Sequence, residues 1–510
     1  MHPRKLIRDS VRFAFSLSVV RAALMARGLL AARMLGPLGY GAWNAMQLMM
    51  DYGVFAAAGT QQGLDQAVPA RIVVGDIVAL ERLKRAGFAN ILLTTLLFIA
   101  GCLVWAGSGS SRLLGTWGFA GIALALFCVL AVNIAYYGLS LLRSHGDMNT
   151  VSTWFVMQGL IGAGLGLALI PRLGEWGLLW GWVAGCLVSL VFVLVRGRRE
   201  APLRWAFGPE NLLLMQIGLP MFVFNSSTIV MRSLDRLIIL RYLGTQDLGY
   251  YSLSVMALTF LLYLPDSVGY VVYPQLLRRY GEAGGDASAI RERVERLLQA
   301  MAVSVPLLSG LAYLWTREIV GLVLPRFLPG VTAVRILCFG AAGLALGTIA
   351  SMVLMTVGRR MALVPAAVFA TALGATLDIV AVRLGFGITG VAWATLATYG
   401  LNGGVLLAMA SAGVGHTSER TLIFVTRSLV PLVIGILLAW ALDRFLPWTH
   451  SSQLGMRAMR LVTGSIAFVF LYIVVVSPFA RGVGLKQLVS EFNLPILSPL
   501  LRRLGSGSES

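Results

Sequence analysis

The sequence predicts an all-α protein that crosses a membrane many times. Hydrophobic residues make up 58% of the 510 residues and charged residues only 12%, whereas an average soluble protein carries about 25% charged residues. The mean hydropathy is +0.81. About fourteen apolar stretches run through the chain, each long enough to cross a hydrocarbon core of about 30 Å as a helix. The alternating segments of about ten residues that mark a membrane β-barrel are not found.

The apolar stretches fall into two groups of six, followed by two more. Short loops rich in Gly, Pro and Arg separate them, and such loops end helices and place charge outside the hydrocarbon. The first group lies near residues 10–35, 41–66, 88–107, 116–141, 150–170 and 176–195. The second group lies near 213–241, 249–275, 297–316, 332–356, 361–382 and 388–412, and the last two stretches lie near 422–443 and 457–477.

This grouping predicts two six-helix lobes related by a pseudo-two-fold axis, then two extra helices and a cytoplasmic tail. An internal repeat supports the pairing of the lobes, because residues 33–40 read R-M-L-G-P-L-G-Y and residues 241–250 read R-Y-L-G-T-Q-D-L-G-Y. Each copy follows the first helix of its group, so the repeat is parallel. A chance match of two Gly-rich turns is the alternative. The predicted boundaries are 1–198, 199–412, 413–478 and 479–510.

Loop charges predict that both termini are cytoplasmic. Basic residues gather in alternate loops, among them the N-terminal segment 4–12, the linker 196–204 and the segment 278–296. The opposite loops carry mainly single arginines, and basic loops stay on the cytoplasmic side of a membrane. The net charge of +19 is spread over these loops and not gathered on one polar domain. Nucleic acid is therefore not an expected partner.

The cysteines and histidines predict neither a metal site nor a disulfide. All four cysteines lie in apolar segments without a C-x-x-C pattern, so they are expected to be small core residues. The four histidines are scattered through loops. No phosphate-binding Gly-rich loop and no G-x-S-x-G motif is found. We therefore expect no catalytic residues, no cofactor and no enzymatic activity.

Small residues recur at helical spacing in three places. Gly177, Gly181 and Gly185 repeat every four residues, as do Gly162 with Gly166 and Gly343 with Gly347. Such spacing lets helix backbones approach closely in lipid. These ridges predict tight helix packing.

Four arginines at predicted membrane depth form the candidate binding site. Arg21 and Arg27 lie in the first span, and Arg232 and Arg236 lie in the seventh. An arginine at the bilayer centre costs about 2.5–3.5 kcal/mol on insertion scales, so these positions indicate a wet internal cavity. A guanidinium presents a planar fork of donors that suits a phosphate or a carboxylate. The four arginines are predicted to bind an anionic group.

The seventh span carries the strongest signal for this site. Arg232, Asp235 and Arg236 share one face of a continuous helix at spacings of three and four residues. Asp235 is expected to neutralise one arginine and to leave about one positive charge. A self-satisfied ion cluster that pins two helices is the structural alternative.

The first span carries arginines at a spacing of six residues, at positions 21, 27 and 33. Six residues turn a straight helix by about 600°, so the three side chains point in different directions unless the helix bends. Gly28 is the expected bend, and Arg33 is expected to reach the outer interface.

Three carboxylates are candidates for ion coupling or charge balance, namely Asp51, Asp235 and Asp266. Asp266 follows Pro265, and a proline can open a helix and free a carbonyl. Buried acids of this kind are candidate proton or sodium sites. Pairing with an arginine of a neighbouring helix is an equal alternative for Asp51 and Asp266, as it is for Asp65 and Asp378.

Two motifs, together with the number of spans, resemble a known family. The first is R-x5-R-x5-R across residues 21–33 with the following L-G-P-L-G-Y-G turn, and the second is S-L-D-R-L-I-I-L-R-Y-L-G…L-G-Y-Y across residues 233–251. Both resemble the Wzx-type oligosaccharide flippases, whose superfamily also holds the lipid II flippases and the MATE drug exporters. The resemblance covers residues 10–480.

The resemblance implies two lobes around a central cavity that opens alternately to each side of the bacterial inner membrane. The implied substrate is a polyprenyl-pyrophosphate-linked oligosaccharide for surface or exopolysaccharide synthesis, such as O-antigen of lipopolysaccharide. A glycan polymerase is an implied partner, and coupling to protons or sodium is an implied option. In the similar lipid II flippases the first two arginines line the cavity, a role that transfers to Arg21 and Arg27. The acidic residue expected after the turn is Ala42 here, which argues against a peptidoglycan precursor.

Two other functions remain as alternatives. A MATE-like antiporter of cationic drugs shares the architecture, but its cavity should be acidic, whereas the deep residues here are net basic. A membrane glycan polymerase or ligase would need a large polar outer loop, and the longest outer segment, near 317–331, is short and hydrophobic.

Overall fold

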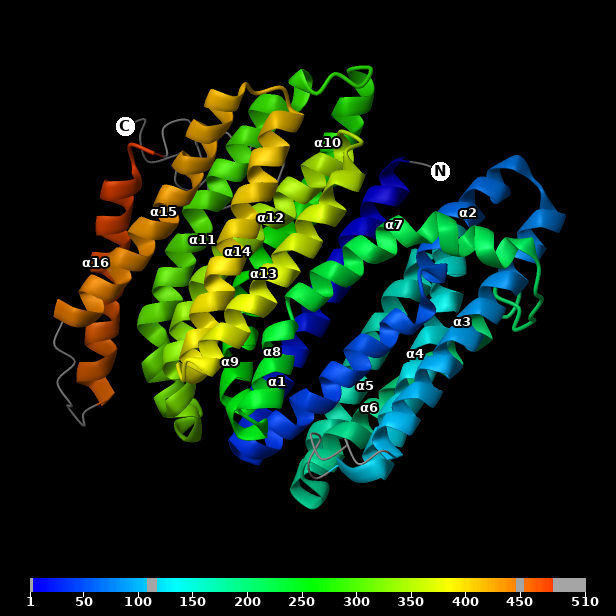
Figure 1. Cartoon of the computed structure of the whole chain (residues 1–510), viewed down its shortest axis with the longest axis horizontal. Helices are drawn as coiled ribbons and strands as arrows, with labels where there is room; N and C mark the ends of the chain where they lie inside the picture. Colours follow the sequence, from blue (N-terminus) through cyan, green and yellow to red (C-terminus); the bar gives the residue numbers. More distant parts are fainter. Residues whose placement is uncertain (1–2, 108–116, 446–453, 480–510) are drawn as a thin grey trace. The chain divides into compact units, whose positions relative to one another are not determined.

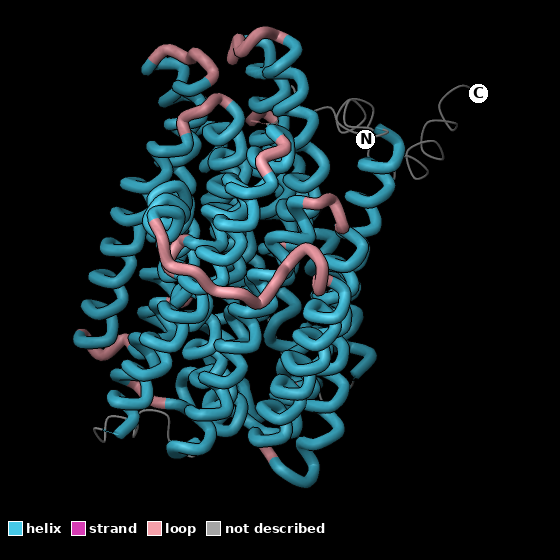
Figure 2. Tube along the Cα trace, turned by 90° about the vertical axis from the view of Figure 1, so that its right-hand side faces the viewer, coloured by secondary structure: helices cyan, strands magenta, loops and turns pink. Residues whose placement is uncertain are grey.

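The computed structural model describes residues 3–107, 117–445 and 454–479, and all regular elements in these ranges are helices (Figure 2). The chain forms two compact units, Met1–Ser252 and Leu253–Ser510. The predicted all-α membrane class is confirmed. The predicted lobe boundary at residue 198 stays a prediction, and the predicted tail from 479 lies outside the described residues except for its first residue.

The first unit contains the helices labelled α1 to α8 in Figure 1 and the start of α9. Helices α3 to α6 are long and apolar, whereas α2 and α8 are short. Their bounds are α1 Pro3–Gly53, α2 Thr60–Val74, α3 Ile77–Gly107, α4 Gly118–Ser144, α5 Met148–Leu173, α6 Glu175–Arg196, α7 Pro209–Met231, α8 Leu234–Tyr242 and α9 Thr245–Leu261, with a 3-10 turn at Val54–Ala57.

The second unit contains the rest of α9 and seven further helices. Helix α12 lies at its centre and is almost wholly buried. The bounds are α10 Tyr263–Glu282, α11 Ser288–Val323, α12 Val331–Thr356, α13 Leu363–Arg383, α14 Gly387–Gly413, α15 Ser418–Phe445 and α16 Leu454–Val476, with 3-10 turns at Pro325–Gly330 and Arg360–Ala362.

Many of these helices can cross a membrane. Eleven helical segments of the described chain are long and apolar enough to do so, and Leu461–Val476 is a shorter apolar helix. Helix α1 holds the first predicted span and part of the second. The protein is therefore a multi-pass membrane protein, and the number of about fourteen spans stays a prediction.

Helix α1 consists of two arms that join at Gly36 (Figure 1). Gly36 has a φ of 69° and a ψ of −178°, which a residue with a Cβ atom rarely adopts. Pro37 follows, and its missing N–H and fixed φ suit the first turn of a helix. The turn predicted between the first two spans therefore falls at this Gly-Pro pair.

The second predicted span is interrupted, so the continuous helix predicted over 41–66 is wrong. The second arm of α1 ends at Gly53, and Ala58 and Gly59 have φ values of 46° and 84° before α2 begins. The Nδ2 of Asn133 in α4 donates to the Gly53 carbonyl at 3.0 Å. This bond satisfies a carbonyl that the helix end leaves open.

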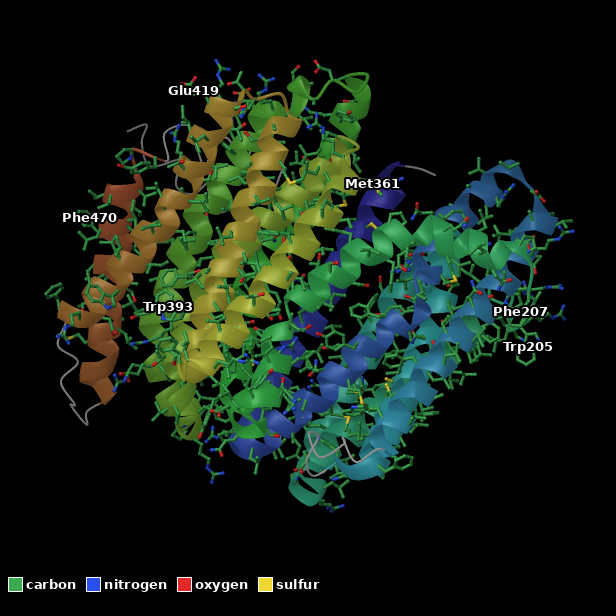
Figure 3. The ribbon with its side chains drawn as sticks, in the orientation of Figure 1. Trp205, Phe207, Met361, Trp393, Glu419 and Phe470 are labelled. Carbon is green, nitrogen blue, oxygen red and sulfur yellow. The ribbon has the colours of Figure 1, made fainter. Side chains whose placement is uncertain are left out.

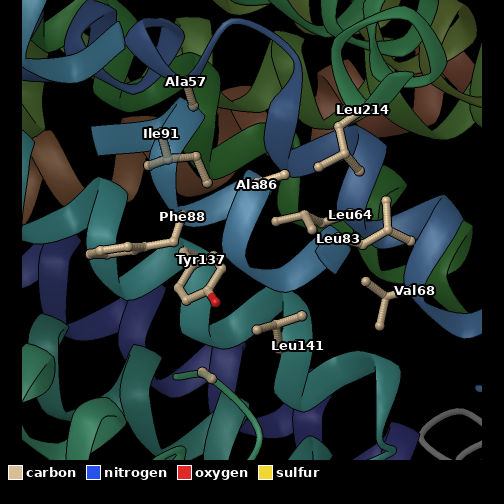
Figure 4. Close-up of a cluster of buried hydrophobic side chains, with 11 residues drawn as sticks. Ala57, Leu64, Val68, Leu83, Ala86, Phe88, Ile91, Tyr137, Leu141 and Leu214 are labelled. Carbon is tan, nitrogen blue, oxygen red and sulfur yellow. The ribbon is translucent and has the colours of Figure 1, made fainter. Parts of the chain in front are cut away.

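Helix α2 then packs closely against α7. A Cβ atom on Gly63 would lie 2.1 Å from the Leu214 carbonyl oxygen, and one on Gly218 would lie 1.9 Å from the Gly59 carbonyl oxygen. Around this crossing lies an apolar cluster with contributions from α2, α3, α4 and α7 (Figure 4). Tyr137 belongs to the cluster, and its hydroxyl lies 3.1 Å from the Lys84 and Pro202 carbonyls.

The predicted glycine ridges pack helices tightly, as expected. In the first unit a Cβ atom on Gly181 of α6 would lie 2.3 Å from the Gly166 nitrogen of α5. In the second unit a Cβ atom on Gly343 of α12 would lie 2.4 Å from the Tyr399 carbonyl oxygen of α14. Only glycine allows such backbone contact in lipid.

An ion pair joins α15 to α12 within the second unit. Both terminal nitrogens of Arg335 in α12 donate to Asp443 in α15, at 2.9 and 3.2 Å. The guanidinium also lies 4.7 Å from the ring centre of Tyr313 in α11. This arrangement joins three helices at one point.

Candidate functional site

The seventh predicted span is broken at the candidate arginines. Helix α7 ends at Met231 and α8 begins at Leu234, so Arg232 and Ser233 lie in a turn. The continuous helix predicted over 213–241 is therefore wrong, and Arg232 lies before the helix that carries Arg236. Neither Gly nor Pro occurs at this break, so no residue there predicts that the helix is interrupted.

A hydrogen bond ties this turn to the second arm of α1. The hydroxyl of Ser233 donates to the Ile229 carbonyl at 2.8 Å, and the hydroxyl of Tyr52 lies 2.7 Å from the same Ser233 oxygen. Because the Ser233 proton is used by the carbonyl, Tyr52 is the donor in the second bond. The turn is thus held from α7 itself and from α1.

Asp235 is buried and accepts two hydrogen bonds. The hydroxyl of Tyr251 donates to Oδ2 at 2.7 Å, and the backbone N–H of Arg236 donates to Oδ1 at 2.7 Å. Arg236 also acts on this carboxylate electrostatically. Asp235 was expected to interact with the neighbouring arginines. It interacts with Arg236, and it also accepts a hydrogen bond from Tyr251, a residue that the sequence did not single out.

Arg236 connects α8 to the second arm of α1. It interacts electrostatically with Asp51, Tyr52 and Tyr40, all on α1. Its Nε is buried without a hydrogen-bond partner among the described residues. Asp51 therefore lies in the field of an arginine from another helix, and its role in charge balance or ion coupling stays a prediction.

Arg27 is the most deeply placed of the four arginines. Its side chain is only 7% exposed, and its Nε and Nη1 have no hydrogen-bond partner in the described part of the chain. Its Cζ lies 5.2 Å from the ring centre of Trp43 and 5.4 Å from that of Trp182. The two indoles, from the second arm of α1 and from α6, hold the cation by cation–π attraction. The Nε and Nη1 donors of Arg27 could therefore form hydrogen bonds with an anion.

Tyr40 lies within electrostatic range of both arginines. This buried tyrosine interacts electrostatically with Arg27 and with Arg236. Both cations therefore act on the same residue of the first unit. Together with Asp51, Asp235 and the aromatic residues, they form a buried cluster of two cations and two carboxylates, which we call the arginine cluster.

The remaining arginines are less buried. Arg21 and Arg232 are half-buried, and Arg33 is exposed. Gly36 is the single residue of α1 with non-helical backbone angles, so the helix is unbroken at Gly28, and the bend expected there stays a prediction. The spacing of six residues therefore points the arginines of the first arm in different directions.

The other acidic residues lie in separate settings. Asp65 accepts from Nη2 of Arg143 at 3.0 Å through both oxygens, which is the ion pair given as its alternative. Asp378 is buried in α13. Asp266 lies near the start of α10, just after an interruption at Leu262 and next to Pro265. The interruption lies three residues before Pro265, so the opening expected beside Pro265 and the ion-coupling role of Asp266 both stay predictions.

The cysteines have the expected core positions. Three of them are buried and Cys102 is half-buried, and all four are free thiols. Among the described residues, no group of three His, Cys, Asp or Glu side chains is placed to hold a metal ion.

Sequence reasoning missed four aromatic residues of the arginine cluster, namely Trp43, Tyr52, Trp182 and Tyr251. Aromatic residues in apolar segments carry no distinguishing signal, because packing alone explains them. The relevant fact is their position beside a cation, and only the tertiary structure provides it.

Solved structures with the same fold are transporters. The lipid II flippase MurJ, in an inward closed conformation, matches 91% of this chain and 99% of its own with a TM-score of 0.64 and 13% identity. A multidrug resistance MATE family transporter of the MOP superfamily, in an inward-facing conformation, matches 81% of this chain and 98% of its own, with a TM-score of 0.61 and 15% identity. A MOP superfamily transporter from Pyrococcus furiosus matches 81% of this chain and 96% of its own, at a TM-score of 0.55 and 17% identity, and its title reports a binding pocket of reverse polarity. At these identities the likeness shows the fold.

Comparison of sequences identifies the family. The search of curated proteins found no match. A family model described as polysaccharide biosynthesis protein matches residues 30–329, which include the Gly36 turn, the second arm of α1 and the α7–α8 break; Arg21 and Arg27 lie before the matched residues. The chain therefore belongs to the polysaccharide biosynthesis protein family and has the fold of the MOP superfamily transporters.

Proposed function

We propose that this protein is a flippase that moves a polyprenyl-pyrophosphate-linked oligosaccharide across the bacterial inner membrane by alternating access. The glycan would serve surface or exopolysaccharide synthesis, in line with the family to which the chain belongs. The observation that carries the proposal is Arg27, a buried cation with open donors between two indoles.

Pyrophosphate is the ligand that fits these donors best. It offers several negative oxygens, and a guanidinium binds such groups through two parallel hydrogen bonds. A buried charge without a partner is costly, so a ligand that supplies the missing acceptors gains that energy on binding. The indoles of Trp43 and Trp182 orient the guanidinium before the ligand arrives, which lowers the entropic cost of binding.

The sign of the charge separates this proposal from a MATE-like exporter of cations. The candidate site has four arginines, and the nearby carboxylates are Asp51 and Asp235. One of these acids already accepts two hydrogen bonds from protein donors. The net positive charge favours an anionic headgroup over a cationic drug.

The energy source is proposed to be the substrate gradient, the membrane potential or an ion gradient. Moving one charge through 100 mV is worth about 2.3 kcal/mol, which biases two states by about fiftyfold. Asp266 is the preferred carboxylate for ion coupling because Pro265 lies beside it in the first turn of α10. Export into vesicles with and without a pH or sodium gradient tests this, because Asp266→Asn should lose the response to the gradient.

The experiment for the main proposal compares glycan export in cells that carry variants of one helix. Arg27→Ala should abolish export while the protein remains in the membrane, and Arg27→Lys should restore it only in part because a point charge replaces the planar fork. Arg33→Ala is the matched control, since Arg33 lies on the same arm but is exposed. Full export by Arg27→Ala would overturn the proposal.

A further inference from the structure

The linker between α6 and α7 presents apolar side chains outside the helical bundle. Leu203, Trp205 and Phe207 are 49%, 68% and 69% exposed, and we call these three residues the linker ridge. Figure 3 shows Trp205 and Phe207 projecting from the edge of the first unit, away from its helices. The proposed transport function makes no use of them.

The lengths of the neighbouring helices place the linker at the depth of the lipid headgroups. Helix α6 has 22 residues and is apolar enough to cross a membrane. At 1.5 Å per residue it is about 33 Å long, close to the thickness of the hydrocarbon core. Its last residue, Arg196, therefore lies at the boundary of the hydrocarbon. Helix α7, also a candidate span, begins at Pro209, so the linker between them stays at that boundary.

Both ends of the linker are fixed to the protein. On one side Ala201 is buried, and the Tyr137 hydroxyl donates to the Pro202 carbonyl at 3.1 Å. On the other side Asn211 accepts from the Gly208 N–H at 2.7 Å and donates to the Asn90 side chain at 2.7 Å. The ridge is thus held between two anchored points and not on a free loop.

The charges around the ridge are suited to an anionic surface. Residues 196–208 contain a single acidic residue, Glu200. The same residues include four exposed arginines, namely Arg196, Arg198, Arg199 and Arg204. Arginine clusters beside a membrane span bind anionic headgroups, and tryptophan prefers the interface between headgroups and hydrocarbon.

We infer that the linker ridge inserts into the headgroup region of the bilayer, with the arginines of the segment bound to anionic phospholipid. The ridge then fixes the depth of the start of α7, the helix that leads to the α7–α8 break. The occupant is the lipid surface itself, since the neighbouring spans continue directly into it.

The test places an environment-sensitive fluorophore on the ridge. Trp205→Cys is labelled in a full-length background whose four native cysteines are replaced, and the protein is reconstituted into vesicles with nitroxide-bearing lipids. The control is Ala289→Cys, an exposed position near the start of α11. Helix α11 has 36 residues, or about 54 Å, so it exceeds the bilayer core and its start reaches water.

We expect blue-shifted emission and strong nitroxide quenching at position 205, and neither at position 289. Both effects should be larger in vesicles with phosphatidylglycerol than in phosphatidylcholine alone, and the triple variant Arg198→Gln, Arg199→Gln and Arg204→Gln should lose that difference. Emission at 205 that matches the control in both vesicles would overturn the inference and would fit a docking site for a soluble protein. Equal quenching in the two vesicle types would overturn the role given to the arginines.

Discussion

At the scale of single residues, Arg27 combines two properties that rarely occur together. It is buried, yet two of its donor nitrogens have no hydrogen-bond partner in the described structure. The indoles of Trp43 and Trp182 partly offset the cost of that burial by cation–π attraction. An arginine whose purpose was structural would be stabilised further by a carboxylate, as Arg335 is by Asp443. This difference between the two arginines supports our proposal that Arg27 binds a ligand.

The role of the indoles can be tested with a pair of variants on α6. Trp182→Leu should weaken the binding of a pyrophosphate lipid by about 2- to 30-fold, which corresponds to the loss of about 0.5–2 kcal/mol of cation–π attraction. Trp180→Leu is the control, because Trp180 lies two residues away and is 44% exposed. Binding is measured with purified protein and a fluorescent pyrophosphate lipid. Equal affinities for the two variants would remove Trp182 from the site.

The sequence could indicate the cations of the site but not their surroundings. Arginines and acids stand out in apolar segments because their insertion into lipid is costly. Arg27, Arg236 and Asp51 could therefore be identified as candidate site residues from the sequence alone. Trp43 and Trp182 could not, since an aromatic residue in a span carries no such cost. Asp235 was assigned to the arginines alone, whereas its neighbour Tyr251 comes from α9, a partner that pattern reasoning had no means to find.

At the scale of helices, the breaks carry most of the new information. The Gly36-Pro37 turn was expected because glycine and proline mark such points. The break at Arg232 and Ser233 was not expected, because tertiary contacts hold it, among them the bond from Tyr52. The interruption before α2 uses a left-handed conformation at Ala58, which its sequence does not favour. Where a helix break is held by contacts with other helices, the sequence pattern therefore wrongly predicts one continuous span.

The two copies of the internal repeat meet through glycines in the first unit. A Cβ atom on Gly41 would lie 1.9 Å from the Thr245 carbonyl oxygen, and one on Gly249 would lie 1.9 Å from the Pro37 carbonyl oxygen. The contact is reciprocal, as expected of two related turns. The second arm of α1 and the start of α9 therefore approach each other to backbone contact.

Adding a methyl group at this contact should force the two helices apart. Gly41→Ala is expected to destabilise the observed arrangement by about 1–3 kcal/mol, because a Cβ atom has no room there. Gly164→Ala is the control, since nothing lies within 4 Å of a Cβ atom at that position, and alanine favours a helix by about 0.5–1 kcal/mol over glycine. Thermal unfolding in detergent measures both. A Gly41→Ala protein as stable as the control would contradict the close contact.

At the scale of the whole molecule, composition alone was enough to give the class. A chain with 58% hydrophobic and 12% charged residues has too little polar surface for a soluble fold of this length. The family match and the shared fold then agree with the resemblance drawn from the motifs around the Gly36 turn and around Arg236. The number of spans and the division into lobes depend on helix ends and breaks, which patterns locate poorly.

The predicted topology can be checked with reporter fusions. The excess of arginine in alternate loops predicts periplasmic readings at Gly174, between α5 and α6, and at Gly109, which lies outside the described residues. It predicts cytoplasmic readings at Gly146 and Gly358. Phosphatase and fluorescent-protein fusions give opposite signals on the two sides. A periplasmic reading at Gly358 would show that the orientation of the second unit is reversed.

We propose that the arginine cluster recognises the pyrophosphate of a lipid-linked glycan, and transport by the reconstituted protein measures this recognition. Purified protein in vesicles is given two fluorescent substrates that share the polyprenyl chain and the sugars, one with a pyrophosphate and one with a neutral linkage. We predict that the wild type and Arg33→Ala move only the pyrophosphate lipid to the opposite leaflet, and that Arg27→Ala moves neither. Equal transport of the two lipids by the wild type, or full transport of the pyrophosphate lipid by Arg27→Ala, would contradict the account.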